Sequence, residues 1–274
     1  MKKLFLAIRH GDIDEVKAIL ERKPEVIDEP ASPPPKKDKG LSPLQVALKT
    51  GELDIAEYLI KSGADVNYTD PIDESETYIW SVPVLQDAIR AVFFAYNGIK
   101  PNIEAAEKAT AIVRDMLKLG ANPNALSWRT VEKFGERSLR QDVDAFGACI
   151  GCASLKEKDS ELRAIHVNKL TELLDLMLEY GADIEAWADR PADCYSNENE
   201  TARKRYIDDF APVPDKTVDV IYRGNSTIPV GDKPIEIKKG DKRGTVVIDG
   251  SIDHAAEGRA YMQDFCKKRG LLGK

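Results

Sequence analysis

Apolar residues recur with helical spacing in short runs over the first two thirds of the chain. Ser42 and Pro43 open one such run, and Pro near the first helical position costs no hydrogen bond. Gly51 ends this run and Gly63 ends the next, each in the position of a glycine that terminates a helix. The pattern predicts two short antiparallel helices whose apolar faces are formed by Leu44, Ala47, Leu48, Ile55, Leu59 and Ile60.

Helices this short are not stable alone, so each pair is expected to stack on neighbouring pairs. Residues 42–47 read SPLQVA, and the run ends in GADVN at residues 63–67. This unit resembles the ankyrin repeat, whose pattern is T-P-L-H-x-A over about 33 residues. Ser replaces Thr and keeps the hydroxyl, whereas Gln45 departs from the usual His. Related endings occur at residues 120–124 and 181–185, and residues 1–28 form a degenerate first unit.

The resemblance covers residues 1–189, with about four repeats at 1–28, 39–68, 81–125 and 143–187. We therefore expect a mainly α fold, an ankyrin-type helical solenoid with elongated repeats. The last three endings lie 57 and 61 residues apart, so two repeats carry roughly 25 residues beyond the usual period. Part of this excess predicts a long helix over 84–97 and helical spacing over 103–117. Phe93, Phe94 and Tyr96 lie on the extra turns, where core packing is favoured over a binding role.

The remaining excess falls in the connections, which form projecting fingers in ankyrin stacks. Three are long: residues 29–39 are Pro-rich and then basic, residues 68–81 are acidic and aromatic, and residues 125–143 have room for a short helix. Insertions in a solenoid gather on one face, often the binding face.

After Trp187 the repeat pattern stops. Residues 190–214 are expected to act as a cap and linker, with a short helix over 201–210 covering the last repeat. Residues 215–274 predict a small α+β segment, with β-like runs at 218–223, 234–238 and 245–249 and a closing helix at 255–269. This β-rich segment resembles no family that we recognise.

Composition limits the function. The chain is 42% hydrophobic and 32% charged, and its net charge of −7 is uneven, with +3 after residue 212 and −10 before it. An acidic body argues against nucleic acid and suits a basic protein partner, although acidity also serves solubility. The apolar run after Met1 is too short for a signal peptide and no run is long enough for a membrane span, so we expect a cytoplasmic protein.

No catalytic motif is present. The three histidines, His10, His166 and His254, have no partner at a recognised motif spacing, and GxGxxG, P-loop and HExxH patterns are absent. Cys149 and Cys152 form a CxxC in a helix-like stretch without a second pair, which favours buried small residues over zinc or redox chemistry. A turn explains residues 240–244 better than a phosphate site. A hydrolytic cluster at Asp249, Asp253 and His254 is supported only by the closeness of these residues in the sequence. We expect no metal and no cofactor.

The sequence therefore predicts a non-catalytic module that captures or inhibits a partner protein, of the inhibitor, immunity or effector type found among such ankyrin proteins. The alternative is a sensor or enzyme whose chemistry lies in the C-terminal segment. Aromatic residues next to carboxylates in or near the fingers resemble an interface hot spot, although they could instead brace one another. The predicted partner-binding residues are Tyr68, Asp70, Asp73, Glu74, Glu76, Tyr78, Trp80, Trp128, Arg129 and Trp187.

Overall fold

The computed structural model describes residues 2–32, 38–96, 101–133, 136–155, 159–190, 201–208, 216–224, 226–230, 235–248 and 256–271. The chain divides into two compact units. The first comprises Met1–Arg129 and Gln141–Arg190, and the second comprises Thr130–Arg140 and Pro191–Lys274. Each unit is described by itself.

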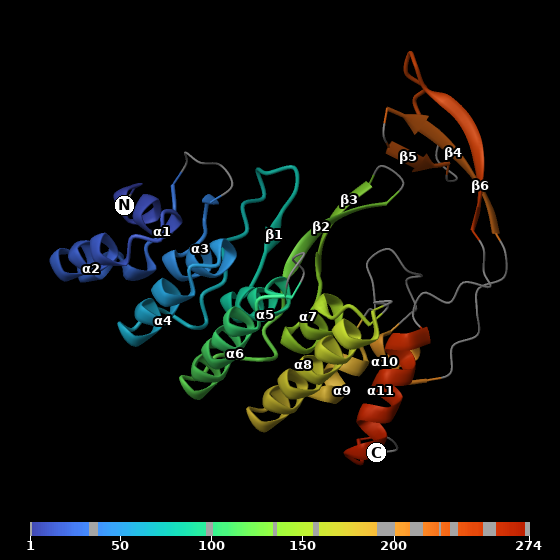
Figure 1. The fold of residues 1–274 in the computed structure, drawn as a ribbon. Helices are drawn as coiled ribbons and strands as arrows, with labels where there is room; N and C mark the ends of the chain where they lie inside the picture. The colour runs from blue at the N-terminus through green and yellow to red at the C-terminus, as the bar shows by residue number, and fades with distance from the viewer. Residues whose placement is uncertain are drawn as a thin grey trace. The chain divides into compact units, whose positions relative to one another are not determined.

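The first unit consists of helix pairs that pack on their neighbours in chain order (Figure 1). The first helices of the pairs, α1, α3, α5 and α7, pack on one another in one row, and the second helices, α2, α4, α6 and α8, follow in a second row. The elements are α1 (Lys2–Arg9), α2 (Ile13–Arg22), the 3-10 helix η1 (Pro24–Asp28), α3 (Pro43–Thr50), α4 (Leu53–Lys61), α5 (Val84–Phe94), α6 (Ile103–Lys118), α7 (Ala145–Cys152), α8 (Ser160–Glu179) and α9 (Ile184–Ala188).

Local signals set the ends of α3 as the sequence predicts. The Ser42 hydroxyl accepts a hydrogen bond from the Gln45 amide, and the Gln45 side chain accepts one from the Ser42 amide, which completes a capping box. Gly51 follows with φ of 80°, a left-handed conformation that suits glycine. Gly63 has φ of 93° after α4. The predicted helix pair is confirmed.

The later helices are lengthened, also as predicted. α5 has 11 residues against 8 in α3, and α6 has 16 against 9 in α4. α5 ends at Phe94, three residues before the expected end at residue 97, and residues 97 and 98 themselves lie outside the described residues. On the extra turns, Phe93 and Tyr96 are buried and pack against the buried His166 ring, at centroid distances of 6.0 and 5.6 Å. Phe94 is 66% exposed, so only two of the three aromatics belong to the core.

A side-chain ladder joins successive repeats at their turns. Asp28, Asn67 and Asn124 accept hydrogen bonds of 2.8 Å from the backbone amides of Asp65, Asn122 and Asp183, respectively. Both asparagines also donate from Nδ2 to a glycine carbonyl of the next turn, that of Gly120 or Gly181. The bonds of Asn67 and Asn124 use the last residue of two G-A-D/N-x-N endings, so the repeated ending has a structural role in the stack.

Before residue 190, the described strands occur only in the fingers. They are β1 (Trp80–Ser81), β2 (Trp128–Lys133) and β3 (Glu136–Gln141), in the order β1-β2-β3. The short helix considered for residues 125–143 is therefore wrong. Residues Trp128, Thr130 and Val131 favour strands, and the β1 strand of the preceding finger supplies an antiparallel partner.

The second unit holds a three-stranded antiparallel sheet with the order β5-β4-β6 and two helices that contact each other. Its elements are β4 (Lys216–Arg223), β5 (Ser226–Pro229), β6 (Lys242–Ile248), α10 (Ala202–Tyr206) and α11 (Ala256–Lys268). β4, β6 and α11 match expected elements. The strand expected at 234–238 is wrong, because residues 235–238 are irregular and the strand lies earlier, at β5.

Candidate functional site

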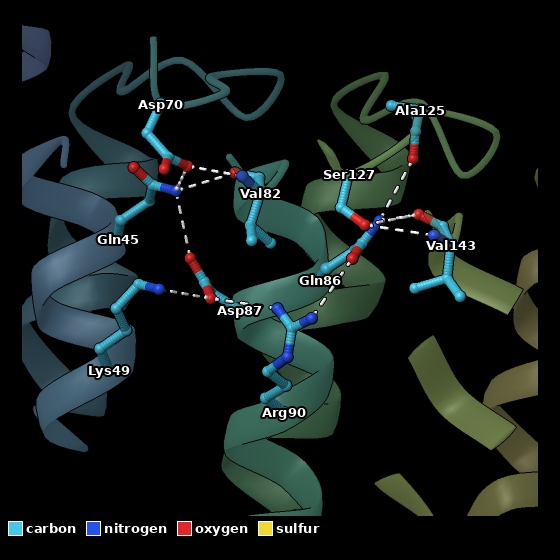
Figure 2. A network of polar contacts seen from close by, with 10 residues as sticks. All are labelled: Gln45, Lys49, Asp70, Val82, Gln86, Asp87, Arg90, Ala125, Ser127 and Val143. Carbon is cyan, nitrogen blue, oxygen red and sulfur yellow. Dashed lines mark hydrogen bonds and ion pairs between the residues drawn. The ribbon is translucent and has the colours of Figure 1, made fainter. Parts of the chain in front are cut away.

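A buried polar network links α3, the second finger and α5 (Figure 2). Gln45 is fully buried at the third position of α3. The two N–H groups of its Nε2 are shared among three acceptors: the Val82 carbonyl at 2.9 Å, Asp70 Oδ1 at 3.1 Å and Asp87 Oδ2 at 3.2 Å. The Val82 amide donates to Asp70 Oδ1 at 2.7 Å. Gln45 thus holds the base of the finger against the start of α5.

The next repeat has the same arrangement. Gln86, at the third position of α5, donates from Nε2 to the carbonyls of Val143 at 2.8 Å and Ala125 at 3.3 Å. Val82 and Val143 precede the N-caps of α5 and α7, so the two glutamines make equivalent contacts. Ser127 takes the place of Asp70, since its hydroxyl accepts from the Val143 amide at 3.2 Å. The glutamine ladder therefore fixes the fingers to the helices.

The network contains a buried carboxylate that forms ion pairs with two cations. Asp87 is 3% exposed and lies 3.1 Å from Lys49 Nζ and 3.4 Å from Arg90 Nη1. Burial raises the pKa of Asp87, and the charge of Asp70 raises it further, while Lys49 and Arg90 act in the opposite direction. Lys49 and Arg90 lie four residues after Gln45 and Gln86, so these two repeats place a cation at the same point.

This arrangement gives a pH prediction. Because the folded-state pKa of Asp87 is raised above its ordinary value of 3.8, its contribution to stability is complete below that pH. The contribution is lost as the pH rises through the folded-state pKa. Urea unfolding of the wild type and of Asp87→Asn, between about pH 4 and about pH 7, should therefore show the wild type losing stability relative to the variant. A difference that stays constant, or moves in favour of the wild type, would contradict the raised pKa.

Trp80 is the most exposed tryptophan that the structure describes, with 60% of its surface accessible. Its ring is supported by Arg90, whose Cζ lies 5.1 Å from the ring centroid. Tyr78, two residues earlier in the finger, is 66% exposed. An aromatic side chain that is exposed and yet fixed by a neighbour can bury large apolar area at a low entropic cost when a partner binds.

The predicted residues Trp80 and Trp128 lie on opposite faces of the finger sheet. In the β1–β2 pairing Trp80 is opposite Arg129, and Ser81 is opposite Trp128. Residues directly opposite each other in an antiparallel pair point to the same face. Trp128 therefore shares the face of the buried Ser81, and Arg129, 3.1 Å from Asp142 Oδ2, shares the face of Trp80.

The acidic part of the finger is partly neutralised. Asp73 and Glu76 lie 2.6 and 2.8 Å from Lys39 Nζ, which comes from the preceding connection. The hydrogen bond from Lys39 lowers the pKa of Asp73 to about 2. Among the described residues, Glu74 has no ion pair. The exposed part of the finger keeps a net charge of −2, from three carboxylates and one lysine.

Three other predicted site residues have structural contacts. Asp70 is buried in the Gln45 network. Tyr68 is half-buried and its hydroxyl donates to the Gly40 carbonyl at 2.6 Å, and burial raises its pKa to about 12. Trp187 lies not in a finger but in α9, where it is 3% exposed and packs on Phe146 at a centroid distance of 5.1 Å.

The other sequence candidates have ordinary surroundings. Cys149 is fully buried and Cys152 is half-buried, and burial raises the pKa of both thiols, as expected of buried small residues. His166 Nδ1 accepts from the Ser154 amide, and His10 is exposed. The possible cluster of Asp249, Asp253 and His254 lies outside the described residues. Within the described ranges, no three His, Cys, Asp or Glu side chains are grouped to hold a metal ion.

Sequence reasoning missed Gln86, Lys49 and Arg90. The signal for them was available, because residues 44–47 and 85–88 both read L-Q-x-A, and each is followed two residues later by a cation. Aligning the repeats on this motif places Gln86 with Gln45 and Arg90 with Lys49. Gln45 is thus a feature shared by two repeats and not a single departure from the ankyrin pattern.

Comparison with known proteins identifies the first helix pairs. The family model described as "Ankyrin repeats (3 copies)" matches residues 2–70. A search of curated proteins found no match. Among the described helices, none is long and apolar enough to cross a membrane. Ankyrin repeats generally serve as protein–protein interaction modules and are not catalytic. The resemblance noted in the sequence is thus confirmed for the N-terminal helix pairs, and residues 2–70 are ankyrin repeats.

Proposed function

We propose that this chain is a non-catalytic module whose repeats extend as a helical solenoid of four units and capture a partner protein. The observation that carries the proposal is Trp80, which is 60% exposed in a finger and held from below by Arg90. Exposed tryptophan with an adjacent arginine has the composition of an interface hot spot. Tyr78 extends the same surface along the finger.

The charge of this surface favours a partner with a basic surface. Lys39 neutralises only part of the finger, so the exposed carboxylates Asp73, Glu74 and Glu76 leave an excess of negative charge beside the aromatics. In this proposal the charge steers association and the aromatic rings hold the complex. Capture of a partner at this surface is compatible with an inhibitor, immunity or effector role.

The partner can be identified by affinity capture from the native cells with the full chain as bait, followed by mass spectrometry. Binding of that partner to variants then tests the site. Trp80→Ala should weaken binding by about 2 kcal/mol or more, mainly through faster dissociation, because the variant loses the exposed indole ring on which the proposed contact depends. Ile103→Ala is a matched control, since Ile103 is 57% exposed in α6, outside the fingers.

Glu74→Lys separates charge from ring contacts, because Glu74 has no ion pair among the described residues. This variant should slow association and reduce its salt dependence, with little change in dissociation. If Trp80→Ala binds the captured partner as tightly as the wild type and Ile103→Ala does not, the contact surface lies outside this finger.

A further inference from the structure

The sheet of the second unit has two edges of different character. β5 is one edge, and it is short, with four residues that end at Pro229. Short length and proline are both features that block pairing at an edge. β6 is the other edge, with seven residues and no proline. Its outer backbone groups have no neighbouring strand in the described part of the chain, so β6 can accept a further strand.

The charges of β6 lie at one end only. Lys242 and Arg243 begin the strand, both are exposed, and neither forms an ion pair within the described ranges. The nearby Asp241 is engaged by Arg223, whose Nε and Nη2 lie 3.0 and 2.8 Å from its two carboxylate oxygens. From Gly244 to Ile248 the strand carries no charge, and the four residues after Gly244 favour β structure. The edge is therefore uncharged over most of its length.

Gly244 adds a specific feature to this edge. Gly244 is opposite Val220 in the register, and Tyr222 is opposite Lys242. The Tyr222 ring leans over the glycine, since a Cβ at Gly244 would lie 2.6 Å from Tyr222 Cε2. Tyr222 remains 39% exposed. A side chain on an added strand, placed beside Gly244, would meet this aromatic ring.

We propose that β6 binds an extended acidic segment of another protein, which adds a fourth, antiparallel strand to the sheet. Residues 216–248 contain seven basic and four acidic side chains, a net charge of +3. This charge attracts an acidic segment and repels a second copy of the same sheet. Backbone hydrogen bonds supply the affinity, and alternate side chains supply the specificity. Acidic residues of the segment lie opposite Lys242 and Arg243, and β-branched residues lie opposite Val246, Val247 and Ile248.

The test uses the full chain and a labelled, end-capped peptide of the sequence Thr-Val-Thr-Thr-Leu-Glu-Glu. This peptide places its two glutamates opposite Lys242 and Arg243 when it pairs antiparallel with β6. Fluorescence anisotropy should show saturable binding, and hydrogen exchange should slow at the amides of β6. Replacing the two glutamates by lysines should weaken binding by roughly tenfold or more. N-methylation of alternate backbone amides, which removes strand hydrogen bonds, should abolish it.

Variants of the chain locate the contact. Lys242→Glu with Arg243→Glu should weaken binding of the acidic peptide by roughly tenfold and favour the lysine peptide. Lys267→Glu with Lys268→Glu makes the same change in net charge on α11, at exposed positions, and should have little effect. Absence of saturable binding to the wild type, equal binding of the N-methylated peptide, or a dimer in light scattering would each overturn the proposal. A dimer in which hydrogen exchange is slowed at the β6 amides without peptide would show that a second copy occupies the edge.

Discussion

Replacing Gln45 by leucine is expected to lower the free energy of unfolding by about 3 kcal/mol, although the two side chains have similar size. The Gln45 amide donates to the Val82 carbonyl, to Asp70 and to Asp87 in a fully buried site. Leucine would leave the Val82 carbonyl without a donor in the described structure. It would also remove one hydrogen bond from each of two buried carboxylates, and the loss of bonds to charged groups is the more costly.

Gln86→Leu is the matched comparison, because Gln86 occupies the equivalent position in the next repeat. Its main acceptor, the Val143 carbonyl, also accepts from the Ser127 amide at 2.9 Å and from the Ser127 hydroxyl at 3.0 Å. The carbonyl therefore keeps partners in the variant, and the expected loss is smaller, about 1–2 kcal/mol. Urea unfolding followed by circular dichroism measures both. Equal losses, or a loss below about 1 kcal/mol for Gln45→Leu, would show that the network contributes little to stability.

The helix pairs could be predicted because their signals are local. The Ser42 N-cap, Gly51 and the apolar spacing between them act within one turn or one pair, and the structure has α3 where they place it. The recurring endings indicated the repeats for a different reason: Asn67 and Asn124 each contact the turn of the next ending, 53 and 57 residues further along the chain, so similar residues recur at each turn. Lengthened helices follow from the distance between endings.

The fingers could not be predicted in the same way, because their structure depends on contacts between segments far apart in the chain. β2 becomes a strand beside β1, which belongs to the preceding finger. Lys39 comes from a third connection and forms ion pairs with two carboxylates that look unpaired in the sequence. The register of β1 and β2 places Trp80 and Trp128 on opposite faces of the finger sheet. Their positions in the sequence do not reveal this register.

Trp187 illustrates the limit most directly. It follows the fourth ending by two residues, a position that leads into a finger in the earlier repeats. Here the ending leads into α9 instead, capped by Asp183, whose side chain accepts from the Ala186 amide at 2.9 Å. Trp187 then packs on Phe146, at a ring-centroid distance of 5.1 Å. Only the packing of α7 on α9 distinguishes this tryptophan from an exposed one.

Trp187→Ala is therefore expected to lower the free energy of unfolding by about 3–5 kcal/mol, the loss typical of a large aromatic side chain removed from a core. The indole is 3% exposed, so the variant loses nearly all of its buried apolar area and leaves a cavity beside Phe146. Thermal and urea unfolding of the full chain measure the change. No role in partner contact is needed to explain this loss.

The matched control is Trp80→Ala, which removes the same side chain from a position that is 60% exposed. Its main structural contact is the Arg90 guanidinium, so the expected loss of stability is about 1 kcal/mol or less. The two variants should therefore differ in the property that they change. Trp187→Ala should lower stability, whereas Trp80→Ala should weaken partner binding in a chain that stays folded. Similar unfolding midpoints for the two variants would contradict this assignment. They would place Trp187 in an accessible position, where the sequence alone had put it.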